Sequence, residues 1–212
     1  MFSTQILVGS GKVLASRPSI VQHLAALAVV QAVKVTTGVA LNIKWPNDIY
    51  LRTAAETSVQ NINLTKMGGV VVAASSNRNG LTLVLGVGVN LDNAKPTCSL
   101  NRVAEDQVGG GKVGKEKLIA SILNHLELLL DKVEAGGWEE VEQEYYKAWL
   151  HSNQPVTVTD KEGREEDVLV VGVDKFGFLR VHCDKSGEDF TVFDDGNSFD
   201  MMAGLIRPKS RV

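Results

Sequence analysis

The chain has 212 residues, of which 44% are hydrophobic and 22% charged, a composition typical of a soluble globular protein with one ordinary domain and a small second one. Its formal net charge is -3, so no strong positive field is available to attract nucleic acid or an anionic membrane. Two cysteines exclude a disulfide framework and indicate a reducing, cytoplasmic location.

The first predicted elements are a short apolar strand, Phe2 to Val8, and a long apolar helix, Ser19 to about Val35. Pro18 is typical of a helix start and Gly38 of a helix end. The stretch from Ile20 to Val35 is expected to be too short and too polar to span a bilayer, and no secretory leader is visible. We therefore expect a largely buried helix.

Strands dominate the next part of the sequence. Alternating apolar residues from Val39 to Trp45 predict a strand that ends at Pro46. The stretch Arg52 to Thr65 is polar and aperiodic, which indicates an insertion-like surface loop. Two β-branched runs, Gly69 to Ala74 and Leu81 to Val89, flank an Asn-Gly pair and predict an antiparallel hairpin.

Two helices and a group of short strands complete the chain. Apolar residues at helical spacing predict helices from Leu118 to Gly136 and from Trp138 to Trp149. Short alternating strands after Gln154 are typical of a small SH3-like β-barrel. We expect an α+β domain over residues 1–152, with helices packed on a mixed or antiparallel sheet, and the barrel over residues 153–212.

Two glycine-rich stretches resemble known nucleotide loops but lack their defining residues. In the stretch that ends at Lys112, Asp106 stands where a P-loop has its first glycine, and Val113 replaces the magnesium-binding Ser or Thr. The Gly86-Val87-Gly88 stretch lies within a strand, with Leu91 in place of the third glycine of a dinucleotide fingerprint. Neither site is expected here.

A first candidate site is the strand end Lys44-Trp45-Pro46-Asn47-Asp48, which brings a lysine, an amide and a carboxylate to one turn. This cluster suits a polar ligand. The alternative is an ordinary turn in which Asn47 or Asp48 caps the backbone and Lys44 is solvated.

A second candidate is Lys66-Met67-Gly68-Gly69, where a cation precedes two glycines at the start of a strand. Glycines let a ligand approach the backbone, and the ammonium can hold a carboxylate or phosphate oxygen. The alternative makes Gly68 a β-bulge and Lys66 a surface charge. Gly86 and Gly88 share one face of the partner strand and could form, with Gly69, a floor for a flat ligand, although close helix packing explains them nearly as well.

Together these segments resemble the central part of biotin protein ligases, a family that includes the holocarboxylase synthetases. The resemblance rests on Lys44 to Asp48, Lys66 to Val70 and Gly86 to Asn90, in this order. The segments Tyr145 to Trp149 and Asp195 to Asp200 are similar to C-terminal segments of the eukaryotic members.

The resemblance implies a class II synthetase-like fold and an enzyme that uses MgATP to activate biotin as biotinyl-adenylate. The biotinyl group then passes to a lysine of a carboxylase carrier domain. Lys66 and Asp48 are implied as catalytic residues, and Asn47 and Asp48 would organise the nucleotide and magnesium. The residues implied to hold biotin or nucleotide are Lys44, Asn47, Lys66, Gly68, Gly69, Gly86, Gly88 and Asn90. No metal site made by the protein alone is expected, and neither nucleic acid nor membrane is an expected partner.

The sequence departs from the family at one place. The glycine- and arginine-rich loop that holds biotin, and the Ser/Thr segment before it, are expected upstream of Phe2 and do not occur. We therefore expect weak or no ligase activity from this chain alone. Two alternatives stay open: a fragment that binds a carrier domain or nucleotide without completing the chemistry, and a relative of the lipoate ligases.

Overall fold

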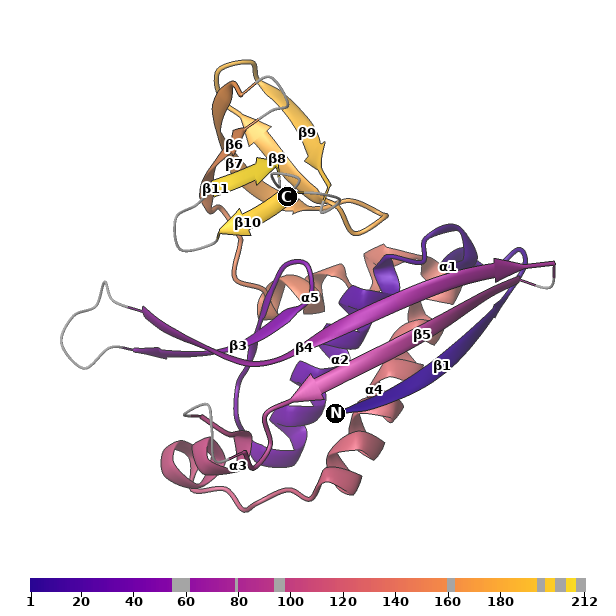
Figure 1. Cartoon of the computed structure of the whole chain (residues 1–212), viewed down its shortest axis with the longest axis vertical. Helices are drawn as coiled ribbons and strands as arrows, with labels where there is room; N and C mark the ends of the chain where they lie inside the picture. Colours follow the sequence, from indigo (N-terminus) through magenta and orange to yellow (C-terminus); the bar gives the residue numbers. More distant parts are fainter. Residues whose placement is uncertain are drawn as a thin grey trace. The chain divides into compact units, whose positions relative to one another are not determined.

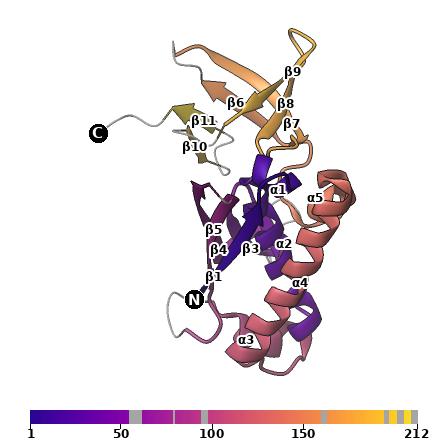
Figure 2. The ribbon, with the colours of Figure 1, turned by 90° about the vertical axis from the view of Figure 1, so that its right-hand side faces the viewer.

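The computed structural model describes residues 1–54, 62–78, 80–93, 98–159, 163–193, 197–200 and 205–208. The chain divides into two compact units, Met1–Leu150 and His151–Val212. Each unit has its own sheet, and the first also contains the helices (Figures 1 and 2).

The first unit is built on a five-stranded antiparallel sheet in the order β1-β5-β4-β3-β2. Its strands are β1 (Phe2–Gly9), β2 (Asn42–Lys44), β3 (Asp48–Ala54), β4 (Ile62–Asn77) and β5 (Gly80–Val89). The predicted hairpin is confirmed, because β4 and β5 pair from Gly68 opposite Val89 to Asn77 opposite Gly80.

The prediction of a surface loop from Arg52 to Thr65 is wrong at both ends of this stretch, which lie in strands. Strand β3 continues to Ala54 and β4 begins at Ile62, with Arg52 opposite Leu64 in the ladder. Backbone hydrogen bonds hold this ribbon, so its polar side chains need not alternate with apolar ones. The middle of the predicted loop, residues 55–61, lies outside the described residues.

Helices cover one face of this sheet (Figure 2). They are α1 (Val13–Ser16), α2 (Ile20–Thr37), α3 (Leu100–Val103), α4 (Lys115–Gly136) and α5 (Glu142–Ala148), with a π-helical turn η1 (Ala104–Val108) and a 3-10 turn η2 (Trp138–Glu140). Helix α2 ends as predicted, since Gly38 takes the left-handed conformation with φ 77°. Helix α4 also ends at the predicted glycine.

The expectation that the apolar helix cannot span a bilayer was wrong. By length and composition, α2 could cross a membrane. However, 72% of it is buried in the first unit, where it packs on α4 and β4. A central helix that is covered on nearly all sides is apolar all round, which explains its composition.

The last residues of the first unit extend the sheet at the edge of β2. Trp149 forms a parallel bridge with Ile43, and the Leu150 amide donates to the Ile43 carbonyl at 2.9 Å. The Asn42 side-chain amide also donates to the Ala148 carbonyl at 3.0 Å. The short strand that carries Lys44 is therefore held on both edges.

The second unit is a six-stranded sheet in the order β10-β11-β6-β7-β8-β9. Its strands are β6 (Pro155–Thr159), β7 (Glu165–Val173), β8 (Leu179–Cys183), β9 (Glu188–Val192), β10 (Asn197–Asp200) and β11 (Leu205–Pro208). Only β11 and β6 pair in parallel among the described pairings. Within the described residues no ladder joins β9 to β10, so the SH3-like barrel stays a prediction.

Candidate functional site

Four of the predicted site residues form a row across the sheet. Lys44 pairs with Asp48, Asp48 with Gly69, and Gly69 with Gly88, so one position from each of β2, β3, β4 and β5 is in register. Their chain neighbours Ile43, Ile49, Val70 and Val87 are buried against the helices. Because side chains alternate along a strand, the row faces away from the helices.

The turn between β2 and β3 is fixed against the neighbouring strand. Trp45 is only 2% exposed, and the Trp45-Pro46 peptide bond is cis. The Asn47 carbonyl accepts a hydrogen bond from the Val70 amide at 2.9 Å. This turn therefore joins the start of β3 directly to β4 beside Gly69.

A β-bulge in β4 directs Lys66 toward the row. Ile49 faces Gly68 while Tyr50 faces Lys66, so Met67 is an extra residue in the ladder. Met67 is fully buried and Lys66 is exposed. The alternative interpretation correctly expected a bulge in this segment, but the extra residue is Met67 and not Gly68. The bulge puts Lys66 on the same face as Gly69.

Lys66 and Asp48 form an ion pair on this face. The Lys66 Nζ lies 2.6 Å from Asp48 Oδ1, with the lysine side chain 54% exposed and the aspartate 21%. Tyr50, which faces Lys66 across the ladder, is half-buried. Burial raises the pKa of Tyr50, and the negative charge of Asp48 raises it further against the opposing effect of Lys66.

The four site glycines differ in how much space surrounds them. A Cβ added to Gly88 would approach only the Gly69 carbonyl oxygen, at 4.0 Å, so the space above Gly88 is open. A Cβ on Gly69 would lie 3.3 Å from Asp48 Oδ1, and one on Gly86 would lie 3.0 Å from a Val71 methyl group. A Cβ on Gly68 would overlap the Gly88 carbonyl oxygen, so close backbone packing explains that glycine.

Asn90 ties the end of β5 to the start of the lysine strand. Its amide nitrogen donates to the Met67 carbonyl at 2.8 Å, and its side-chain amide lies 3.4 Å from the Lys66 carbonyl. Its own carbonyl accepts from the Leu100 amide at 2.8 Å. Asn90 therefore positions the backbone under Lys66.

Sequence reasoning missed two residues near this site. Tyr50 shares the open face with Asp48, and this could have been found from its position two residues further along a strand. Asn101 is 1% exposed, and its side chain bonds Asp92 at 3.0 Å and both backbone groups of Val113 at 2.9 and 3.1 Å. No local pattern singles out Asn101, because its partners are distant in the sequence.

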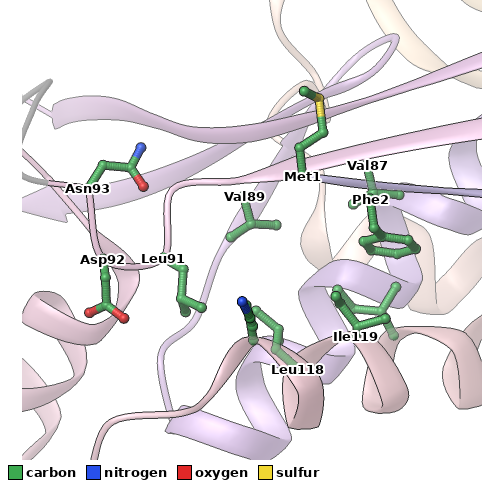
Figure 3. Close-up of a pocket in the computed structure, with 11 residues that line it drawn as sticks. Met1, Phe2, Val87, Val89, Leu91, Asp92, Asn93, Leu118 and Ile119 are labelled. Atoms are coloured by element: carbon green, nitrogen blue, oxygen red, sulfur yellow. The ribbon is translucent and has the colours of Figure 1, made fainter.

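A separate cavity of about 310 Å³ lies on the helix side of the sheet (Figure 3). Apolar side chains of β1, β5 and α4 line it, among them Phe2, Val87 and Leu118, with Asp92 and Lys115 also at its wall. None of the predicted site residues lines this cavity. In the described part of the chain, no group of three or more His, Cys, Asp or Glu side chains could hold a metal.

Comparison with known proteins gives two family matches. Residues 2–90 match the biotin/lipoate A/B protein ligase family, and residues 151–201 match the biotin protein ligase C terminal domain. The chain is 36% identical over 206 residues to a human biotin--protein ligase. This alignment covers 93% of this chain and 27% of the human protein. It is 30% identical over 219 residues to the chloroplastic biotin--protein ligase 1 of Arabidopsis thaliana, an alignment that covers 99% of this chain and 55% of that protein.

The chain spans from 27% to 62% of the length of four such curated relatives. Among solved structures, the apo biotin protein ligase of Aquifex aeolicus aligns with a TM-score of 0.64 at 14% identity, covering 91% of this chain and 79% of that one. The same ligase in complex with biotin and ATP aligns with a TM-score of 0.61 at 15% identity, and the alignment covers 90% of this chain and 74% of that one. These structures share the fold, which confirms the predicted α+β class.

Proposed function

Since the chain belongs to the biotin/lipoate A/B protein ligase family, we propose that it carries the adenylate-binding face of an ATP-dependent biotin protein ligase. In this reaction the biotin carboxylate attacks the α-phosphorus of ATP and pyrophosphate leaves. The ε-amine of a carrier-domain lysine then attacks the acyl carbon, an amide forms and AMP leaves. The observation that carries the proposal is the row Lys44, Asp48, Gly69 and Gly88 with Lys66 paired to Asp48.

Positive charge is needed where oxygens gain negative charge during adenylation. Lys66 and Lys44 both flank Asp48, one through the ion pair and one through the β2–β3 register. An ammonium has three donors, so Lys66 can hold a ligand oxygen while it keeps one bond to Asp48. We assign Lys66 and Asp48 as catalytic residues on this basis.

The glycines supply the surface on which the ligand lies. The open space above Gly88 lets a flat acyl-adenylate reach the backbone, next to the carboxylate and the lysines. Gly69 and Gly86 border this surface, and Gly68 and Asn90 maintain the strands beneath it. Holding the acyl group and nucleotide together on a rigid sheet makes the attack effectively intramolecular.

Magnesium is proposed as the cofactor that would neutralise the phosphates of ATP. It usually binds through one or two carboxylates together with substrate phosphates, so a site with a single aspartate fits it. Asp48 would supply the carboxylate and Asn47, at the same turn, an amide oxygen.

We extend the proposal to the two domains, the protein substrates and the location. Residues 1–152 would form the class II synthetase-like part, and residues 153–212 a small SH3-like barrel, supported by the short antiparallel strands from β6 to β9. Carboxylase carrier domains would be the protein substrates, as in a holocarboxylase synthetase, with a cytoplasmic location.

Adenylate formation by the purified chain tests the proposal. The chain is incubated with biotin, magnesium and ATP labelled at the α-phosphate, and biotinyl-adenylate is resolved by chromatography, with Lys66→Ala as the control. Biotinyl-adenylate whose formation depends on Lys66 supports the first step of the ligase reaction. Transfer of the biotinyl group to a carrier domain would support the second step. Carrier or nucleotide binding without any product would instead support a binding module.

Lipoate is the competing substrate, because the matched family includes lipoate ligases. Equal amounts of biotin and lipoate are offered with ATP, and the two acyl-adenylates are quantified. Preferential formation of lipoyl-adenylate would replace the biotin assignment.

A further inference from the structure

Tyr50 occupies a central place on the open face. It is in register with Asn42 on β2 and with Lys66 on β4. Its chain neighbours Ile49 and Leu51 are 0% and 5% exposed, so they point into the core and Tyr50 points away from it. The bulge at Met67 creates this pairing, because an unbroken ladder would place Met67 opposite Tyr50.

Three side chains thus converge on one spot. Asp48 lies two residues before Tyr50 on the same face, and its carboxylate binds the Lys66 ammonium at 2.6 Å. Directly opposed residues on neighbouring strands have Cβ atoms about 5 Å apart. A tyrosine and a lysine that face each other can therefore reach one shared atom above the sheet.

The Tyr50 hydroxyl is available as a hydrogen-bond donor. Its pKa is raised by burial and by Asp48, so the phenol stays protonated at neutral pH. Within the described part of the chain, no hydrogen bond involves this hydroxyl. A half-buried polar group without a partner beside an ion pair is suited to a ligand atom.

We propose that the Tyr50 hydroxyl is a further ligand contact, which donates a hydrogen bond to the anionic oxygen that Lys66 also holds. This rests on the proposed function, and the ligand class is an acyl-adenylate, whose acyl phosphate carries an anionic oxygen. Lys66 supplies the charge, and Tyr50 supplies a neutral donor whose direction is fixed by its half-buried ring. Together they select a phosphate oxygen over a neutral carbonyl.

The experiment compares the full chain with Tyr50→Phe, which removes only the hydroxyl. Two probes are titrated by calorimetry: biotinol-adenylate, whose phosphodiester cannot acylate, and biotin methyl ester, which has no anionic oxygen. Tyr50→Phe should weaken biotinol-adenylate about tenfold, the usual effect of a lost hydrogen bond to a charged group, and change the ester less than about twofold. The matched control Tyr146→Phe, on α5, should change neither.

Each other outcome overturns the inference in a distinguishable way. If Tyr50→Phe binds biotinol-adenylate as tightly as the unchanged chain, the proposed Tyr50 hydrogen bond is refuted, but the proposed function is not. Equal weakening of both probes makes Tyr50 a structural residue, which urea unfolding of the variant would also reveal. No binding of either probe by the unchanged chain overturns both the contact and the adenylate site.

Discussion

The Lys66 ammonium lies 2.6 Å from the Asp48 carboxylate on the face of the sheet that points away from the helices. Asp48 therefore balances the charge of Lys66 when no ligand is bound. Because Lys66 is 54% exposed, solvent screens this pair and it contributes little to folding. An anionic ligand can share Lys66 with Asp48 without breaking a structural element.

Replacing Lys66 by Ala should therefore affect binding much more than stability. The loss of a charge-assisted contact should weaken biotinol-adenylate by about 10- to 100-fold. The free energy of unfolding should change by less than about 1 kcal/mol, because the pair is exposed. Calorimetry and urea unfolding measure the two effects.

Lys112 provides the matched control for this substitution. It lies 3.8 Å from Glu105 in an exposed ion pair outside the row. Lys112→Ala should leave biotinol-adenylate binding unchanged. Equal losses in the two variants would mean that the ligand responds to overall charge and not to Lys66.

Gly68 on β4 and Gly88 on the neighbouring strand β5 should respond differently to an added methyl group. Gly68→Ala should destabilise the fold by about 2 kcal/mol, because its Cβ would overlap the Gly88 carbonyl. Gly88→Ala should change stability by only about 0.5 kcal/mol, since its Cβ would enter open space, but should obstruct the adenylate. Urea unfolding and calorimetry on both variants check this, and a fully stable Gly68→Ala would disprove the close approach.

The sequence predicted the elements whose signals are local. The α2 and α4 helices and the β4–β5 hairpin follow from apolar spacing and turn residues. The grouping of Lys66 with Asp48 also agrees with the structure, although it came from family resemblance. Motifs made of adjacent residues can be recognised from the sequence, because they do not depend on which strands pair with one another.

Features that depend on pairing could not be predicted. The bulge at Met67 decides which face Lys66 occupies, and it exists only relative to β3. The ribbon through Arg52 was mistaken for a loop because its backbone ladder leaves no side-chain pattern. Strand alternation alone places Tyr50 on the face of Asp48, but the pairing of Tyr50 with Asn42 and Lys66 depends on the neighbouring strands and could not be predicted.

Asn101 should be important for stability. Its buried side chain joins Asp92, three residues after the end of β5, to the backbone of Val113 before α4. Asn101→Ala would leave the buried Val113 groups without partners, so a loss of about 2 kcal/mol is expected. Asn93→Ala, which removes an exposed amide, is the control and should cost less than about 0.5 kcal/mol in urea unfolding.

Glu144 should make stability depend on pH. It accepts hydrogen bonds from Lys132 on α4 at 2.7 Å and from Gln31 on α2 at 2.6 Å, and the Lys132 bond is the main reason its pKa is lowered. A carboxyl whose folded pKa is below its unfolded value of about 4.3 stabilises the fold above that pH, and the effect is lost as the pH falls through the folded pKa. Glu144→Gln should therefore lower the urea midpoint at about pH 7, and this difference should shrink toward about pH 3. In a Lys132→Met background most of the pH-dependent difference should disappear, whereas a difference independent of pH would refute the assignment to the carboxylate.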